Sequence, residues 1–361
     1  MKLACIAGAR PNFVKMAALV AEIRRRPALH YQLIHTGQHY SAEMSASFFS
    51  DLDIPPPDVN LGVGSGTSLW QTAEIMKRLE PVLNQSQPDV ILVVGDVNST
   101  LAGALAGVKL GIPVAHVEAG LRSFDRSMPE EINRVLTDAV SDFLFVSEPS
   151  GEKNLLAEGV PREKIFFAGN VMIDTLLRFR KKAEMSDVLA RLDLRPGGYA
   201  VATLHRPSNV DRADALAGLM RALSDIARRL PVIFPVHPRT EQMLKTLQPG
   251  SNGIVLISPL GYLDFLHLMS HACLVLTDSG GIQEETTILQ VPCLTLRTNT
   301  ERPVTIAEGT NTLVGADPAH IVNAAIAALE SPPSRSRVPE RWDGRASERI
   351  LDVLTAACPR R

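Results

Sequence analysis

Ile112-Pro-Val-Ala-His-Val-Glu-Ala-Gly-Leu-Arg-Ser123 joins an apolar run to a charged segment, and this junction decides the fold class. The run Val114–Val117 is short and almost entirely apolar, which is typical of a strand buried on both faces of a parallel sheet. Open α/β sheets bind ligands beyond the carboxyl ends of such strands. The charged segment that follows therefore predicts a ligand site; it contains Glu118, Arg122, Asp125, Arg126, Glu130, Glu131 and Arg134.

A second strand-like run, upstream of the first, also ends on a carboxylate. Ile91-Leu-Val-Val-Gly-Asp96 is apolar up to its last two residues. Taken singly, acids at such positions are also common as helix caps and in solvated loops. Two neighbouring strand ends that both carry acids favour a functional site over a structural cap.

Short apolar runs alternate with amphipathic stretches along almost the whole chain. Stretches such as Asn12–Arg26 and Ala213–Arg229 predict helices between the strands. We therefore expect an α/β fold of two Rossmann-like domains, each a parallel sheet flanked by helices and joined by right-handed crossovers. The predicted strands form two series, Leu3–Ala7, Gln32–Thr36, Val90–Val94, Val114–Val117, Phe143–Val146 and Ile165–Ala168, then Ala200–Leu204, Val232–Pro235, Ile254–Ile257, Leu274–Thr277, Cys293–Leu296 and Thr312–Val314.

Segments that break secondary structure suggest where the domains begin and end. We expect the first domain over residues 1–170 and the second over 171–344, with the boundary near Gly169-Asn170. Ser331–Pro339 is rich in proline and serine and is interpreted as a surface loop. The last segment, 345–361, has a helical pattern, and we expect it to pack back on the first domain.

Composition argues against nucleic-acid and membrane partners. The chain has 361 residues, of which 45% are hydrophobic, enough for two domains with cores of their own. The formal net charge is −2, aromatic residues make up 5%, and no basic block is present, so we expect no nucleic-acid partner. No apolar run reaches the length that spans a bilayer.

Cysteine usage and the first residues point to the cytoplasm. The chain contains no C-x-x-C pair, and most cysteines lie in or beside apolar runs, which predicts buried thiols in a reducing compartment. The apolar run before Arg10-Pro11 is too short for a signal peptide and is interpreted as a first strand. The four cysteines are Cys5, Cys273, Cys293 and Cys358.

The turn after the first predicted strand could hold an anion. In Ala7-Gly-Ala-Arg-Pro-Asn-Phe-Val-Lys15, Gly8 permits a tight turn into a helix. Free N–H groups at the helix start, together with Arg10 and Lys15, would suit a phosphate. The motif is not G-x-G-x-x-G, so it predicts no nicotinamide cofactor. An exposed basic helix start is an equally simple interpretation.

Thr277-Asp-Ser-Gly-Gly-Ile-Gln-Glu-Glu285 is the strongest local signal. Ser279, Gly280 and Gly281 would begin a helix whose N–H groups and partial positive charge suit a pyrophosphate. Glu284 or Glu285 could accept hydrogen bonds from the paired hydroxyls of a ribose. The structural alternative is a capping motif formed by Ser279 and the acids of the helix start.

Two histidine–arginine groups lie at predicted strand ends in the second half of the chain. They are His205-Arg206 and His237 with Arg239, and Arg302 lies in a further charged turn. Histidine changes charge near neutral pH and arginine binds phosphate through two N–H groups, so both suit a phosphorylated ligand. The spacing of histidine, cysteine and acidic residues predicts no zinc site, and the sequence has no nucleophile elbow.

Together these motifs resemble the non-hydrolysing UDP-N-acetylglucosamine 2-epimerase family. They occur in the family's order and are jointly highly specific. The matching stretches are Gly8–Pro11 with Lys15, Thr36–His39, Gly95-Asp96, His116–Ser123, Pro129–Arg134, Gly169-Asn170 with Asp174, His205-Arg206, Pro235–Pro238, Asp278–Glu285 and Thr300–Pro303.

The resemblance implies a GT-B-like architecture, with the nucleotide sugar in a cleft between two Rossmann-like domains. It implies reversible conversion of UDP-GlcNAc to UDP-ManNAc by a homodimer, without cofactor or metal. Its catalytic set matches Asp96, Glu118, Glu130 and His205, and residues matching Arg10, Lys15, Ser279 and Glu285 hold UDP. Further candidates for binding the UDP-sugar are Arg134, Arg206, His237, Gly280, Gly281 and Arg302.

The implied chemistry explains why these residue types are needed. The C2 hydrogen of the sugar is not α to a carbonyl, so the C1–O bond breaks first and acidifies it. UDP leaves, a 2-acetamidoglucal forms, and UDP then adds again. Inversion at C2 needs a proton removed from one face and delivered to the other, hence at least two acid/base groups. The residues alone do not assign which carboxylate is the acid and which the base.

Several positions depart from the common family pattern and leave the exact sugar and allosteric activation by UDP-GlcNAc open. An epimerase of a related UDP-2-acetamido sugar and a GT-B glycosyltransferase remain alternatives. A hydrolysing epimerase and a non-enzymatic sensor of nucleotide sugars are two others. The departures are Tyr40-Ser41, Pro207–Asn209, Arg239 and Val304.

Overall fold

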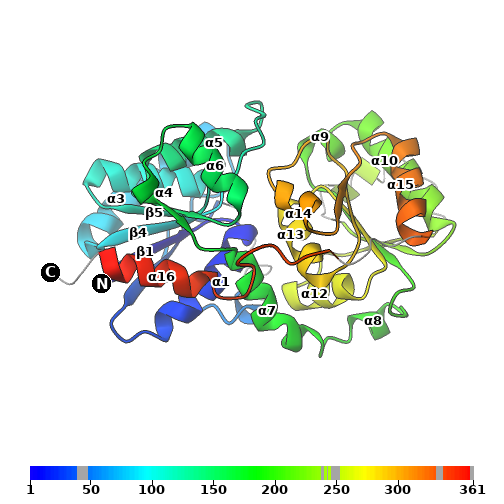
Figure 1. Cartoon of the computed structure of the whole chain (residues 1–361), viewed down its shortest axis with the longest axis horizontal. Coiled ribbons are helices and arrows are strands. Elements are labelled where there is room, and N and C mark those ends of the chain that lie inside the picture. Colours follow the sequence, from blue (N-terminus) through cyan, green and yellow to red (C-terminus); the bar gives the residue numbers. More distant parts are fainter. Residues whose placement is uncertain (39–47, 237–239, 242, 245–252, 331–335, 358–361) are drawn as a thin grey trace. The chain divides into compact units, whose positions relative to one another are not determined.

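The structure is a computed structural model that describes residues 1–38, 48–236, 240–241, 243–244, 253–330 and 336–357. The chain folds into two compact units (Figure 1). The first unit comprises residues 1–178 together with 340–361, and the second comprises 179–339. The two units divide after residue 178, within a helix that spans Val171–Ala183. This helix begins directly after residue 170, where the boundary was expected.

The first unit contains a seven-stranded sheet in which every pairing is parallel. The strand order is β3-β2-β1-β4-β5-β6-β7. Strand β3 was not predicted, because two residues are too few to show an apolar run. The strands are β1 (Lys2–Ala7), β2 (His30–His35), β3 (Val59–Asn60), β4 (Val90–Val94), β5 (Val114–Ala119), β6 (Phe143–Val146) and β7 (Ile165–Phe167).

Helices cover both faces of this sheet (Figure 1). Helices α3, α4 and α5 pack in series on one face, and α1 packs against α16 on the other. The carboxylate of Asp174, on α7, accepts the N–H groups of Ala346 and Ser347 and so holds the start of α16. The helices are α1 (Arg10–Arg24), α3 (Ser68–Ser86), α4 (Asn98–Leu110), α5 (Pro129–Val140), α6 (Pro149–Ala157), α7 (Val171–Ala183) and α16 (Ala346–Ala357), with a 3-10 turn at Arg162–Lys164.

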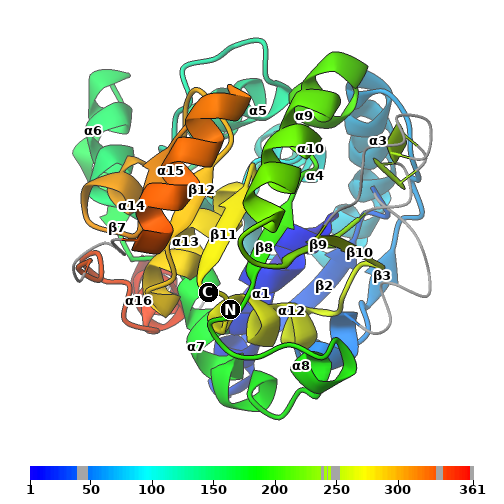
Figure 2. The same ribbon diagram turned by 90° about the vertical axis from the view of Figure 1, so that its right-hand side faces the viewer.

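The second unit contains a six-stranded parallel sheet in the order β10-β9-β8-β11-β12-β13. Its strands are β8 (Ala200–Thr203), β9 (Val232–Pro235), β10 (Ile254–Ile257), β11 (Leu274–Thr277), β12 (Cys293–Thr295) and β13 (Asn311–Leu313). Its helices are α8 (Val188–Arg191), α9 (Pro207–Val210), α10 (Ala213–Ala227), α12 (Tyr262–Ser270), α13 (Gly280–Leu289), α14 (Pro303–Ala307) and α15 (Pro318–Glu330). Figure 2 shows α10 and α15 side by side.

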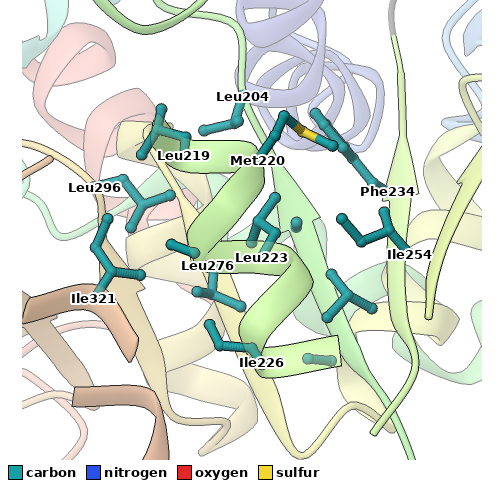
Figure 3. Packing of buried hydrophobic residues seen from close by; sticks show 14 of the residues in the cluster. Leu204, Leu219, Met220, Leu223, Ile226, Phe234, Ile254, Leu276, Leu296 and Ile321 are labelled. Atoms are coloured by element: carbon teal, nitrogen blue, oxygen red, sulfur yellow. The ribbon is translucent and has the colours of Figure 1, made fainter. Parts of the chain in front are cut away.

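The core of the second unit shows why the amphipathic pattern was informative. Leu219, Leu223 and Ile226 recur on α10 at helical spacing and are at most 2% exposed. They pack against strand residues such as Phe234 and Leu276 (Figure 3). Burying each such side chain contributes roughly 1.5–3 kcal/mol, so this face of α10 fixes the helix to the sheet.

Both sheets have the doubly wound order of a Rossmann fold, and the expected architecture of two such domains is confirmed. In each, the connection reverses direction between two central strands, β1 and β4 in the first unit and β8 and β11 in the second. Ligands of doubly wound sheets bind beyond the carboxyl ends at this point. None of the helices formed by the described residues has the length and apolar character needed to cross a bilayer.

Candidate active site

Glu118 lies at an irregularity near the carboxyl end of β5. The register between β5 and β6 shifts between Val117 and Ala119, as in a β-bulge. The φ angle of Glu118 is 76°, in a region that residues other than glycine rarely adopt. Bulges next to active sites redirect side chains, and the strain they store is characteristic of functional positions.

The Glu118 side chain forms a buried ion pair with Lys15, which comes from α1. The Lys15 Nζ atom lies 2.7 Å from both carboxylate oxygens, and both side chains are 4% exposed. A Cβ atom on Gly95, whose φ angle is 68°, would lie 2.8 Å from Nζ, so a larger residue would displace the lysine. Lys15, predicted to contact UDP, is therefore placed beside a candidate catalytic carboxylate.

Arg134 bridges two acids of the same unit. Its Nη1 lies 2.5 Å from Asp96 Oδ2, and its Nη2 lies 2.6 Å from Glu131 Oε2. Glu131 also accepts the N–H groups of Ser123 and Phe124, each at 2.9 Å. Burial alone would raise the pKa of Glu131, but these N–H groups and Arg134 hold it below its usual value. Arg134 and Glu131 thus shape the loop that carries the charged segment.

Glu130 differs from its neighbour Glu131. It lies half-buried in the first turn of α5. Within the part of the chain that the structure describes, its carboxylate has no hydrogen bond or ion pair. Two adjacent glutamates therefore have different surroundings: Glu131 is tied to the protein, and Glu130 is available to a ligand.

A buried network supports the ends of β4 and β5, and sequence reasoning missed it. Asp138 accepts from Arg122 Nη1 at 2.7 Å and from the N–H of Gly120 at 3.0 Å. Its other oxygen lies 2.7 Å from His116 Nδ1, and His116 Nε2 lies 2.8 Å from the Gly95 carbonyl oxygen. Burial would raise the pKa of Asp138, but the contacts with His116 and Arg122 hold it below its usual value. Asp138 was missed because nothing local marks a buried acid in the middle of a helix.

The start of α1 is less open to an anion than the sequence suggested. The N–H groups of Gly8 and Ala9 donate to Asn12 Oδ1, at 3.3 and 3.2 Å. A Cβ atom on Gly8 would lie 1.9 Å from Ser99 Oγ, so this glycine is needed for packing. Arg10 is exposed at the helix start. The expected free N–H groups are thus partly taken by Asn12, and Arg10 is the exposed charge of this motif.

The start of α13, in the second unit, has the form expected of a phosphate site. No side chain caps its N-terminus, so the capping alternative for Ser279 is wrong. A Cβ atom on Gly280 would lie 2.7 Å from Glu301 Oε1, so glycine is required where the chain approaches this side chain. An uncapped helix start presents its N–H groups and the positive end of the helix dipole to an anion. Gly281 is the second residue of the same helix.

Buried arginines surround the acids near this helix. Glu301 Oε2 lies 2.8 Å from Arg297 Nη2, while Glu301 Oε1 lies 3.3 Å from Arg302 Nη1 and 3.5 Å from Arg206 Nη2. Arg302 Nε also lies 2.7 Å from Glu284 Oε1. Burial would raise the pKa of Glu301, but the arginines hold it well below its usual range. Arginine side chains bind phosphate groups through paired N–H donors, so Arg206 and Arg302 beside this helix suit a pyrophosphate.

His205 and Glu285 each have a buried partner that the sequence did not reveal. His205 Nδ1 lies 2.7 Å from Asp278 Oδ1 at the end of β11. Glu285 is 6% exposed and accepts a hydrogen bond from the Tyr262 hydroxyl at 3.0 Å. Burial raises the pKa of Glu285 from 4.5 to about 7. Asp278 carries the same strand-end signal as Asp96, and that signal could have identified it.

The candidate residues therefore form two sets, one at the carboxyl end of each sheet. The first contains Asp96 and Glu118 with their cationic partners, and the second gathers around Asp278 and the start of α13. His237, also a candidate, lies outside the described residues. Across the ranges that the structure describes, no three histidine, cysteine or acidic side chains are arranged to hold a metal ion.

Comparison with known proteins agrees with this arrangement. The family model of UDP-N-acetylglucosamine 2-epimerase matches residues 21–355. A UDP-N-acetylglucosamine 2-epimerase of Methanocaldococcus jannaschii is 43% identical over 98% of this chain and 99% of that protein. The crystal structure of the M. jannaschii enzyme in complex with UDP-GlcNAc and UDP superimposes with a TM-score of 0.92 over 99% of this chain and 100% of that one.

A relative that is named for another sugar has the same sequence identity over a somewhat shorter part of the chain. A UDP-2,3-diacetamido-2,3-dideoxy-D-glucuronate 2-epimerase of Pseudomonas aeruginosa is 43% identical over 91% of this chain and 92% of that protein. Family members thus differ in the sugar named as their substrate. Because the family model covers nearly the whole chain and relatives match it end to end, this protein belongs to the UDP-N-acetylglucosamine 2-epimerase family and is an enzyme with a GT-B-like fold.

Proposed function

We propose that this enzyme reversibly converts UDP-GlcNAc to UDP-ManNAc by anti elimination and re-addition of UDP. The proposal is carried by three carboxylates: Asp96 and Glu118 lie at the carboxyl ends of β4 and β5, and Glu130 lies in the first turn of α5, the helix whose Arg134 contacts Asp96. A transfer of sugar to an acceptor does not require three grouped acids. Removal of a C2 proton and its return to the other face does require positioned acid/base groups.

The surroundings of the three acids support a division of roles. Asp96 is held by Arg134 at 2.5 Å, which suits a fixed negative charge beside the oxocarbenium-like C1. Glu130 has no cationic partner in the described part of the chain, so no ion pair competes with its contact to the sugar. Glu118 lies 2.7 Å from Lys15, so the carboxylate and the ammonium act as one unit. We infer that Glu130 serves one face of C2 and the Glu118–Lys15 pair serves the other.

The second unit supplies the groups that would hold UDP during elimination. When the C1–O bond breaks, its electron pair moves onto a phosphate oxygen. The uncapped start of α13, with Arg206 and Arg302 nearby, suits that charge. Glu285 is the candidate for the ribose hydroxyls. UDP that stays bound can add again to the glucal.

A proton NMR time course in deuterated water tests the proposed reaction. Purified enzyme is mixed with UDP-GlcNAc, and the C2 and C1 signals of the sugar are followed. We expect a UDP-ManNAc signal to grow while deuterium enters C2 of both sugars. Release of free ManNAc and UDP would show a hydrolysing enzyme instead, and epimerisation without deuterium entry would contradict elimination through exchangeable acids.

A related UDP-2-acetamido sugar is the second candidate substrate. The observation that favours it is the relative from P. aeruginosa, which has the same sequence identity to this chain as the M. jannaschii enzyme. The same experiment with UDP-2,3-diacetamido-2,3-dideoxy-D-glucuronate discriminates between the two. This sugar would be the preferred substrate if its kcat/KM were at least about tenfold higher than that of UDP-GlcNAc. A tenfold difference corresponds to about 1.4 kcal/mol of transition-state stabilisation.

We further infer that the enzyme is a homodimer and works in the cytoplasm. Ile132 and Leu136, one helical turn apart on α5, are 38% and 44% exposed. Leu69 and Trp70, at the start of α3 in the same helical layer, are 82% and 44% exposed. Helix α4 packs between α3 and α5, and exposed apolar groups that gather in one such layer are typical of a protein contact. Three described cysteines carry free thiols, which suits a reducing compartment.

A further inference from the structure

The ends of β8 and β11 bring His205 and Asp278 together. The two strands are neighbours at the centre of the second sheet, with Thr203 paired to Thr277. The hydroxyl oxygens of these two threonines are 2.7 Å apart, which fixes the strand ends side by side. Asp278 follows one strand directly, and His205 follows the other after one residue. Their meeting is therefore a consequence of strand pairing and not of loop conformation.

Asp278 is fully buried and is surrounded by donors. Its carboxylate accepts the N–H of His205 at 3.1 Å and that of Arg206 at 3.0 Å. Asn209 Nδ2 donates to it at 3.0 Å. Burial alone would raise the pKa of Asp278, but His205 and these donors hold it below its usual value. Asp278 is therefore a fixed carboxylate, bonded to the backbone turn that carries His205.

The same carboxylate also orients the imidazole ring. His205 Nδ1 lies 2.7 Å from Asp278 Oδ1, and the His205 side chain is 59% exposed whereas that of Asp278 is 0% exposed. A carboxylate can only accept, so the proton of the neutral ring resides on Nδ1. Nε2 is then the atom that exchanges a proton with the surroundings. In a neutral imidazole, the hydrogen bond made by one ring nitrogen determines which of the two nitrogens carries the proton.

We propose that Asp278 is a positioning residue that holds His205 with Nδ1 protonated and Nε2 available to the departing UDP. This rests on the proposed function, in which UDP leaves C1 and later adds again. As the C1–O bond breaks, its electron pair moves onto a phosphate oxygen. His205 enters this step as the imidazolium and transfers its Nε2 proton to that oxygen, which leaves the neutral ring with its proton on Nδ1. On re-addition the proton returns to Nε2, so the step balances without a further reactant.

The first test is a pair of matched variants. Asp278→Asn retains an oxygen for the backbone donors, but its amide N–H₂ faces Nδ1 and moves the ring proton to Nε2. We expect kcat to fall at least about 100-fold, with KM for UDP-GlcNAc changed less than about threefold. Asn209→Ala removes another hydrogen bond from the same carboxylate and leaves His205 untouched, so kcat should remain within about threefold of wild type. Equal losses in both variants would overturn the proposal.

A double-variant cycle separates positioning from general support of the fold. If Asp278 acts through the ring, Asp278→Asn should change kcat less than about threefold in the His205→Ala background. A further loss as large as that seen with His205 present would overturn the proposal, because it would show an action that does not pass through His205.

The tautomer can be measured without any variant of Asp278, in case Asp278→Asn does not fold. The ¹⁵N spectrum of histidine-labelled enzyme gives the protonation of both ring nitrogens, and His205→Gln identifies the signals. The ring should be either the imidazolium or, when neutral, protonated on Nδ1, whereas a neutral ring whose proton lies on Nε2 overturns the proposal. An enzyme that binds UDP-GlcNAc without epimerising it would contradict the proposed function, while the spectrum would still decide the role of Asp278.

Discussion

At the scale of single residues, the carboxylates of the first unit differ in their partners although the sequence presents them alike. Glu118 is ion-paired to Lys15, Asp96 to Arg134, and Glu130 to no described residue. We expect both Glu118→Gln and Glu130→Gln to lower kcat by about 10²–10⁴-fold, because each removes an acid/base group. UDP binding, measured by calorimetry, should be retained. Asp125→Asn, in the same segment, is the control, and wild-type turnover by the two glutamine variants would contradict the assignment.

The Lys15–Glu118 pair predicts a stability difference between these two variants. Glu118→Gln leaves the Lys15 ammonium buried without a carboxylate, which costs about 3–5 kcal/mol. Glu130→Gln leaves no such charge and should be nearly neutral. Adding Lys15→Met to Glu118→Gln should restore much of the lost stability. Thermal unfolding of the three proteins checks this expectation; a double variant no more stable than Glu118→Gln would show that the buried charge is not the cause.

Glu285 predicts a pH dependence. Because burial raises its pKa from 4.5 to about 7, the folded protein binds a proton there that the unfolded chain has released. The contribution of Glu285 to stability is therefore complete below about pH 4.5 and is lost as pH rises through about 7, a loss of about 3 kcal/mol. The melting temperature of Glu285→Gln should fall less than that of wild type over this range. Glu80→Gln, on the exposed side of α3, is the control and should follow wild type.

At the scale of secondary-structure elements, the start of α13 should determine affinity for UDP. A Cβ atom at Gly280 would lie 2.7 Å from Glu301 Oε1 and displace the side chains around the helix start. We expect Gly280→Ala to raise the Kd for UDP at least about tenfold, or about 1.4 kcal/mol. Gly218→Ala on α10, where the nearest atom to the new Cβ is 3.4 Å away, should bind UDP as wild type does. Calorimetry of both variants decides this.

The same scale shows what the amphipathic patterns could and could not predict. The pattern over 213–229 indicated a helix, and α10 occupies Ala213–Ala227 with its apolar residues in the core. The turn before α1 was expected to present free N–H groups, but two of them bond to Asn12. Periodicity reports which face of a helix is buried, whereas the partners of a helix terminus depend on the side chains that reach it.

At the scale of the whole molecule, the proposed homodimer predicts a change of mass. Leu136, 44% exposed on α5, belongs to the apolar surface defined by Leu69, Trp70, Ile132 and Leu136. We expect Leu136→Asp to halve the mass measured by light scattering, because a buried unpaired charge is unfavourable in a contact. Met185→Asp changes an equally apolar residue that is 78% exposed elsewhere and should leave the mass unchanged. A dimeric Leu136→Asp variant would place the contact on another surface.

The sequence by itself determined the class of fold and the strand ends at which chemistry occurs. The alternation of apolar runs and amphipathic stretches is a local property, so it survives in the sequence and predicted the two parallel sheets. Asp96 and Glu118 were identified because each lies at or just beyond the end of an apolar run. The motif from Asp278 to Glu285 was identified for the same reason.

Only the tertiary structure decided which charges meet. Lys15 reaches Glu118 from 103 residues away, and Asp278 reaches the His205 backbone from 73 residues away. Likewise, adjacent Glu130 and Glu131 are indistinguishable in the sequence, but only Glu131 is held by Arg134 and the loop. The physical reason is that parallel strands bring distant chain segments to one edge of a sheet. The partner of an ionisable group, and hence its role, is therefore set by strand order and helix packing.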